Sequence, residues 1–245
     1  MMDRNIIERM KDIQVIVVDV DGTITDERGL LDVRAIEKIR ELERKGITVS
    51  LASGNALPVT KALASYIGAS GPVIAESGCV IELLGEIWVY GDPEPINMAL
   101  DHLKRVYGDR IRESWSNIYR HVDKAIRATI PIDELMKIVS RYDGVTILDS
   151  GFAYHLHPRD IDKGTALREA SILLNLPQEF FMAIGDSELD IPMLEAAGIG
   201  VALGNAPDEL RGVADITISD KYADGFLRIV DMVIREKYRG VPSRG

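Results

Sequence analysis

Short hydrophobic runs alternate with amphipathic segments over most of the chain. Residues 13–18 form a nearly continuous β-branched run, typical of a parallel strand covered on both faces. Asp32 then precedes apolar residues at helical spacing and Gly46 follows them, which predicts a helix between the two. We expect the alternation to continue with a strand at residues 47–52, a helix ending at Gly68 and a strand at 72–75. This order is typical of βαβ crossovers and a parallel sheet.

The alternation changes after Gly78. Residues 80–84 and 87–90 are separated by Gly85 and Glu86, which predicts an antiparallel hairpin. A new unit is expected to begin near there. Its predicted elements are amphipathic helices at 96–107 and 132–142 and strand-like segments at 125–130 and 145–156, the last broken at Ser150 and Gly151. These elements indicate a small α+β insertion.

The βα alternation resumes at Lys163 and continues to the end of the chain. We expect strands at 180–184, 199–203 and 215–219, helices at 163–174, 189–197 and 225–237, and a frayed tail at 239–245. The predicted fold class is therefore α/β, with a parallel sheet, helices on both faces and an α+β insertion.

The composition fits a soluble globular protein and limits the kinds of partner that it is expected to bind. The chain has 245 residues, of which 46% are hydrophobic and 28% charged, enough for a core domain and a smaller one. With 39 acidic and 29 basic residues the formal net charge is -10, so we expect neither nucleic acid nor membrane as a partner. The single cysteine, Cys79, excludes an intramolecular disulfide. With no targeting signal or long apolar run in the sequence, we expect a cytoplasmic location.

Polar segments follow several of the predicted strands. In an open α/β sheet the ligand binds outside the carboxyl ends of the strands, so these segments should meet at one edge. They are residues 19–22, residues 53–55, the region before Lys163 and residues 185–190.

Each of these segments also has a plain structural interpretation. Residues 19–22 fit an acidic turn, and Ser53 fits an N-cap for the next helix. Lys163 alone fits a solvated lysine, and Ser187 with Asp190 fits a capping box. Cys79 is expected to be a buried structural thiol, and the four histidines show no zinc spacing.

Taken together, the polar segments indicate a site for a cation and a phosphoryl group. Asp19, Asp21, Asp186 and Asp190 would repel one another at one sheet edge unless a cation neutralised them. Hard oxygen ligands favour Mg²⁺, which also binds phosphate oxygens. Ser53 and Lys163 are available to offset the charge of a phosphoryl group.

The ordered motifs resemble those of the haloacid dehalogenase-like phosphatases. They are DVDGT at residues 19–23, SGN at 53–55, Lys163 before Gly164, and GDSELD at 185–190. The insertion, ESG at 76–78 and GNAPDEL at 204–210 are similar to features of the Cof-like subgroup. Within it the chain looks most like the archaeal phosphoglycolate phosphatases, which share SGN. The resemblance implies a Rossmann-like core at residues 1–84 and 158–245, and an α+β cap domain at 85–157.

The resemblance also implies roles for individual residues. Asp19 would be the nucleophile that forms an aspartyl-phosphate, and Asp21 would protonate the leaving group and then activate water. Mg²⁺ would be held by Asp19, the backbone carbonyl of Asp21 and Asp186, with Asp190 a further ligand or a support. The phosphoryl group would be bound by Ser53, Gly54 and Lys163. The expected activity is Mg²⁺-dependent hydrolysis of a small phosphate monoester, 2-phosphoglycolate first among them.

Some questions stay open at this level. The family often has Asn at the positions of Leu189 and Ser77, so polar contacts near Lys163 or the substrate are expected to differ. Candidate substrate contacts in the cap are Arg120, Tyr154 and His155. The alternative functions are a sugar-phosphate phosphatase, a phosphomutase and, as a minor one, a receiver-like phospho-acceptor module. The sequence leaves the oligomeric state open, a homodimer included.

Overall fold

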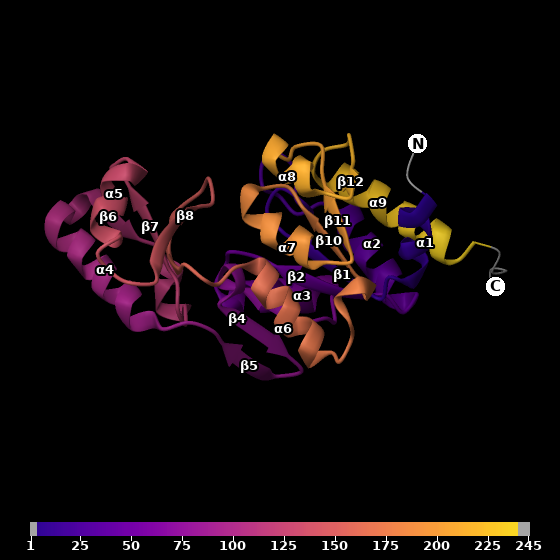
Figure 1. Cartoon of the computed structure of the whole chain (residues 1–245), viewed down its shortest axis with the longest axis horizontal. Coiled ribbons are helices and arrows are strands. Elements are labelled where there is room, and N and C mark those ends of the chain that lie inside the picture. The colour runs from indigo at the N-terminus through magenta and orange to yellow at the C-terminus, as the bar shows by residue number, and fades with distance from the viewer. Residues whose placement is uncertain (1–3, 240–245) are drawn as a thin grey trace.

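The computed structural model describes residues 4–239, which form a larger core domain and a smaller cap domain (Figure 1). The core contains an eight-stranded sheet in the order β12-β11-β10-β1-β2-β3-β4-β5. Six of these strands run parallel, namely β1 (Val15–Asp19), β2 (Thr48–Ala52), β3 (Val73–Ala75), β10 (Phe181–Gly185), β11 (Ile199–Ala202) and β12 (Ile216–Thr217). The hairpin β4 (Val80–Leu83) and β5 (Glu86–Val89) extends the sheet in antiparallel pairing.

Helices cover both faces of the core sheet, which explains why β1 is apolar at successive positions. Ile16 and Val18 pack in one cluster with α1 (Arg4–Asp12), α2 (Val33–Arg44), α3 (Leu57–Ile67) and α9 (Tyr222–Lys237). Val15 and Val17 pack on the other face with α6 (Lys163–Leu173), α7 (Ile191–Ala196) and α8 (Asp208–Val213). Helices α1 and α9 lie together at the end of the core remote from the cap (Figure 1).

The cap is an antiparallel sheet packed against two helices. Its strand order is β6-β7-β9-β8, with β6 (Ile111–Glu113), β7 (Lys124–Ala128), β8 (Val145–Asp149) and β9 (Tyr154–Pro158). Leu103 of α4 (Pro93–Tyr107) and Leu135 of α5 (Ile132–Val139) are fully buried with Ile126 and Leu156 of the sheet. The chain enters the cap after β5 and leaves it after β9, so two connections join the domains (Figure 1).

The predicted architecture is confirmed, with differences in detail. Helices α1 and α8 and the short strand β6 were not predicted, whereas the break at Ser150 and Gly151 does separate β8 from β9. The domain limits at residues 84 and 85 stay a prediction, although the pairing of β4 with β5 places that whole hairpin on the core sheet. The tail predicted to be frayed lies outside the described residues except for Arg239. Within residues 4–239 no helix is long and apolar enough to cross a membrane.

Candidate active site

The register of the core sheet brings three polar strand ends together. Strand β1 lies between β10 and β2, with Val18 opposite Ile184 and Asp19 opposite Ala52. Asp186 follows directly after β10 and Ser53 directly after β2. The convergence of these side chains at the carboxyl edge therefore follows from the parallel pairing, as predicted.

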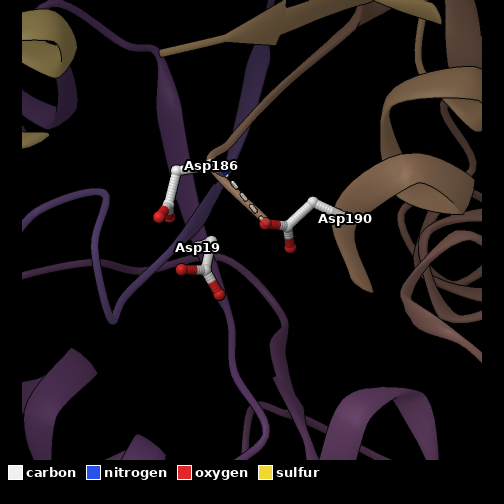
Figure 2. Close-up of side chains that lie close together, drawn as sticks. All are labelled: Asp19, Asp186 and Asp190. Carbon is white, nitrogen blue, oxygen red and sulfur yellow. Dashed lines mark hydrogen bonds between the residues drawn. The ribbon is translucent and has the colours of Figure 1, made fainter. Parts of the chain in front are cut away.

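Three carboxylates at this edge form a compact acidic group. One oxygen each from Asp19, Asp186 and Asp190 lies within 4.8 Å of the others, and Figure 2 shows the side chains turned toward a common space. Asp190 belongs to the 3-10 helix Glu188–Asp190 after β10 and is fully buried. Its Oδ2 accepts from the backbone N–H of Asp186 at 3.1 Å and from Ser187, so the predicted capping box is present.

Lys163 supplies a positive charge inside the acidic group. Its Nζ donates to Asp19 at 2.5 Å and to Asp190 at 2.6 Å. The side chain is 4% exposed, so the interpretation of Lys163 as a solvated lysine is wrong. Lys163 is the first residue of α6, whose N-terminus Asp162 and Thr165 cap reciprocally. Gly164 is required next to it, because a Cβ there would lie 2.1 Å from the carbonyl oxygen of Pro192.

Burial makes the acidic group unfavourable when it is fully ionised. Burial raises the pKa of Asp19 well above its usual value, the charges of Asp190 and Asp186 add to the rise, and Lys163 opposes it. The pKa of Asp186 is raised to about 7, first by burial and then by Asp190. Burial would lower the pKa of Lys163, but Asp19 and Asp190 outweigh it and raise that pKa instead. One lysine therefore does not neutralise the three carboxylates.

The donor set fits a hard divalent cation. Carboxylate oxygens are the ligands that Mg²⁺ prefers, and a cation among Asp19, Asp186 and Asp190 would offset the carboxylate repulsion that, after burial, adds to the raised pKa values of Asp19 and Asp186. The carboxylate of Asp21 lies outside this group of three, and the assignment of its backbone carbonyl as a ligand stays a prediction.

Asp186 is held in place by residues of two neighbouring loops. Thr23 donates its hydroxyl to Asp186 Oδ1 at 2.6 Å, and Asn205 donates its amide to Asp186 Oδ2 at 2.9 Å. The Asn205 amide also donates to the carbonyl of Gly22 at 3.0 Å. Gly22 has a φ of +92°, and a Cβ there would lie 2.2 Å from Asp186 Oδ2. The tight turn after β1 thus needs glycine for both its conformation and the space it leaves to Asp186.

The loop after β2 carries Ser53, Gly54 and Asn55. Ser53 is buried, and its Oγ accepts from the backbone N–H of Asn55 at 3.1 Å. The prediction that Ser53 caps the next helix is wrong, because α3 has Ala56 at its N-cap with no side-chain capping bond. The Asn55 amide donates to Ser53 Oγ at 3.0 Å and to Asp21 Oδ2 at 3.1 Å. Asn55 therefore links the second motif to the first.

Asp21 lies in a partly desolvated position beside these groups. Burial raises its pKa, while Lys163 and the hydrogen bond from Asn55 oppose the rise. A carboxyl group with a raised pKa holds its proton more readily near neutral pH, which suits a group that gives and takes a proton.

Two of the three cap candidates, Arg120 and His155, are bonded within the protein. Arg120 and His155 are buried and both bond to Asp123, Arg120 at 2.5 Å and His155 at 2.8 Å. Tyr154 is half-buried on β9. Cys79 is buried against His157, as expected for a structural thiol, and burial raises the pKa of its thiol.

Thr23, Asn55 and Asn205 were not named as site residues from the sequence. All three lie inside the motifs quoted for the resemblance, at the ends of strands. Thr23 and Asn55 lie close in sequence to the predicted site residues Asp21 and Ser53, whereas Asn205 lies in a motif with no predicted site residue. What the sequence did not give was the direction of each side chain.

Comparison with known proteins identifies the family of this chain. The family model of haloacid dehalogenase-like hydrolases matches residues 16–107 and 104–230. A phosphoglycolate phosphatase of Methanoculleus marisnigri is 40% identical over 223 residues, covering 89% of this chain and 95% of that protein. One of Methanospirillum hungatei is 38% identical, with the same coverage of 89% and 95%.

The solved structures include similar folds. The crystal structure of Thermoplasma acidophilum 0175 has a TM-score of 0.84 and 30% identity, and covers 91% of this chain and 98% of that one. A haloacid dehalogenase-like hydrolase from Bacteroides thetaiotaomicron has a TM-score of 0.76 at 21% identity, covering 90% and 99%, which indicates a common fold alone.

Proposed function

The chain belongs to the haloacid dehalogenase-like hydrolases, and from this premise we propose that it is a Mg²⁺-dependent phosphatase of small phosphate monoesters, with 2-phosphoglycolate as its substrate. Membership of this family and relatives named phosphoglycolate phosphatase identify it as a phosphoric monoester hydrolase.

The observation that carries the proposal is the group formed by Asp19, Asp186, Asp190 and Lys163. Three acidic oxygens lie within 4.8 Å of one another and share a single buried ammonium, so the group keeps an excess of negative charge that a stable core does not require. An arrangement of this kind suits a cation and a phosphoryl group that complete the charge balance.

Asp19 is the proposed nucleophile. Its carboxylate oxygen attacks the phosphorus atom, the bond from phosphorus to the ester oxygen breaks, and the leaving alkoxide takes a proton from Asp21. Asp21 then takes a proton from water, whose oxygen attacks the phosphorus, and the bond from phosphorus to Asp19 breaks to release phosphate. The raised pKa of Asp21 suits the first of these proton transfers.

The other site residues would bind and orient. Ser53 and the backbone of Gly54 are proposed to hold the transferring phosphoryl oxygens, and Lys163 would offset their charge while it holds Asp19 in position. Asp19, Asp186, Asp190 and the carbonyl of Asp21 are the proposed surroundings of Mg²⁺. The ion, when bound, would polarise the phosphoryl group and reduce its repulsion of Asp19.

The preference for 2-phosphoglycolate is supported by the relatives' names and by coverage of nearly their whole length. We also propose a cytoplasmic location and no nucleic-acid or membrane partner, in keeping with one cysteine and a net charge of -10. The presence of the cap, and a match that covers both domains, favour this proposal over a receiver-like module.

The test is phosphate release from a panel of esters that includes 2-phosphoglycolate, hexose phosphates and p-nitrophenyl phosphate, with Mg²⁺ or with EDTA. We expect the highest kcat/KM for 2-phosphoglycolate and no turnover in EDTA. Preferential hydrolysis of a hexose phosphate would support the sugar-phosphate alternative, and an isomeric product would indicate a phosphomutase. No metal-dependent turnover on any ester would reject the proposed function.

A further inference from the structure

The loop of Ser53, Gly54 and Asn55 is held by three successive backbone carbonyls. The Ser53 carbonyl accepts from the N–H of Ser77 at 3.1 Å, and the Asn55 carbonyl accepts from the N–H of Glu76 at 2.9 Å. Both donors belong to the core, in the 3-10 helix Glu76–Gly78. The carbonyl between them, that of Gly54, accepts from the cap instead.

That donor is the guanidinium of Arg120. Its Nη1 and Nη2 each lie 3.1 Å from the Gly54 carbonyl oxygen, so one oxygen receives two charge-assisted hydrogen bonds. Arg120 directly follows the 3-10 helix Trp115–Tyr119 between β6 and β7. A residue from the cap therefore completes the support of the proposed phosphoryl-binding loop.

Arg120 is itself fixed in this orientation. Its side chain is 3% exposed and pairs with the fully buried Asp123 at 2.5 Å. The Nε of Arg120 donates to Ser116 Oγ at 3.3 Å, and His155 bonds to the second oxygen of Asp123 at 2.8 Å. A buried guanidinium is costly unless it is paired and hydrogen-bonded, and here it is paired with Asp123 and bonded to Ser116 and to Gly54.

A second contact holds the same cap segment on the core. The Glu76 carboxylate accepts from the backbone N–H of His121 at 2.9 Å and from that of Val122 at 3.0 Å. Glu76 and Ser77 have φ values of 52° and 51°, an unusual conformation for residues other than glycine. The strained segment thus contacts the loop on one side and the cap on the other.

The contact with Gly54 extends to the residues of the reaction. The Gly54 carbonyl and the Asn55 N–H belong to one planar peptide, so fixing the oxygen also fixes the direction of the N–H. That N–H donates to Ser53 Oγ, and the Asn55 side chain donates to Asp21. This peptide therefore contacts Ser53 directly, and Asp21 through the side chain of Asn55.

We propose that Arg120 is a positioning residue, through which the cap orients the Gly54–Asn55 peptide and completes the phosphoryl-binding loop. The inference rests on the proposed function in so far as that function makes this loop the phosphoryl site. It replaces the expectation that Arg120 contacts the substrate, because its guanidinium is already bonded to Gly54, Asp123 and Ser116.

The experiment uses the full chain with Mg²⁺ and compares Arg120→Lys and Arg120→Ala with the wild type. Arg127→Ala is the matched control, because Arg127 is an exposed arginine on β7 of the same cap. Binding of inorganic phosphate is measured by calorimetry, and kcat and KM are measured with 2-phosphoglycolate. Urea unfolding of each variant shows whether the fold is retained.

We expect Arg120→Ala to weaken phosphate binding by ~10-fold or more and to lower kcat by at least as much, as the loss of a charge-assisted bond implies. Low, non-denaturing concentrations of guanidinium ion should restore part of the kcat of Arg120→Ala and leave that of Arg127→Ala unchanged. Arg120→Lys keeps a cation beside Asp123 but cannot reproduce the paired bonds, so a folded Arg120→Lys should show the same direction of change. If Arg120→Ala does not fold, Arg120→Lys decides.

Folded Arg120 variants with the phosphate affinity and kcat of the wild type would overturn the inference. A loss of activity that guanidinium does not restore, with unchanged phosphate binding, would also count against it. If the wild type binds phosphate but hydrolyses no ester, the proposed function fails while the comparison of phosphate affinities still decides the role of Arg120.

Discussion

Replacement of Asp186 by Asn should make the metal-free protein more stable at neutral pH and abolish its response to Mg²⁺. Asp186 has a pKa of about 7 in the folded protein against a usual value of 3.8, chiefly because of burial and the nearby Asp190. The folded state therefore binds the proton more tightly than the unfolded state does. The ionisation of Asp186 therefore lowers the free energy of unfolding as pH rises from about 4 to about 7, and the full loss is present above that range.

The difference between 3.8 and about 7 corresponds to about 4 kcal/mol of stability at pH values above 7. Asn at this position keeps a carbonyl oxygen that accepts from Thr23. Its NH₂ group, however, faces the NH₂ group of Asn205, and the lost hydrogen bond costs about 1 kcal/mol of stability. The net expectation is a gain of about 3 kcal/mol in the free energy of unfolding for Asp186→Asn in EDTA at pH 8. Near pH 4 the wild type is largely protonated there, so the gain should vanish.

The assay is urea unfolding followed by circular dichroism, at pH 4.5 and pH 8, in EDTA and in saturating Mg²⁺. Mg²⁺ should stabilise the wild type at pH 8, by about 2.7 kcal/mol at a concentration 100 times its Kd, and should leave Asp186→Asn unchanged. The exposed Asp109→Asn is a matched control, expected to show no effect beyond about 0.5 kcal/mol. A variant less stable than the wild type in EDTA at pH 8 would refute the reasoning, since it would mean that burial and Asp190 do not disfavour the Asp186 carboxylate.

Three further changes test the remaining parts of the site. Asp19→Asn should lower kcat by more than ~10³-fold, because the attacking oxygen is lost, and should keep the far-ultraviolet circular dichroism of the wild type, because the fold is retained. Substantial residual turnover would reject Asp19 as nucleophile. Lys163→Met should lower the free energy of unfolding in EDTA by about 3–5 kcal/mol, because two buried carboxylates lose their partner. A loss below about 1 kcal/mol in urea titrations would contradict the two ion pairs. Gly22→Ala should weaken Mg²⁺ binding by ~10-fold or more in calorimetry, since its Cβ would lie 2.2 Å from Asp186 Oδ2. If the variant binds Mg²⁺ with the affinity of the wild type, Asp186 moves freely.

The parts of the fold that could be predicted are those set by local pattern. The apolar run of β1 and the turn chemistry after it determine that Asp19 ends a doubly covered strand, and parallel pairing then brings Asp186 and Ser53 to its side. The amphipathic helices α4 and α5 indicated a separate unit for the same reason.

Features that depend on distant contacts could not be predicted. The resemblance predicted Lys163 as a site residue, but its burial between Asp19 and Asp190 depends on the packing of α6, which no local pattern shows. The contact of Arg120 with Gly54 joins residues 66 positions apart, for which no spacing rule exists. Ser53 was interpreted as the N-cap of the next helix, but the N-cap of α3 is Ala56, three residues later.

The most direct test of the account is to trap the covalent intermediate. The wild-type protein is mixed with 2-phosphoglycolate and Mg²⁺, quenched within milliseconds, reduced with borohydride and digested, and the peptides are analysed by mass spectrometry. We predict that the acyl phosphate is reduced to homoserine at position 19 alone. The amount of this homoserine should change when EDTA is added to the wild type, and also when Asp21→Asn replaces the wild type. Hydrolysis at full rate with no modification at Asp19, or with modification of another residue, would contradict the central claim.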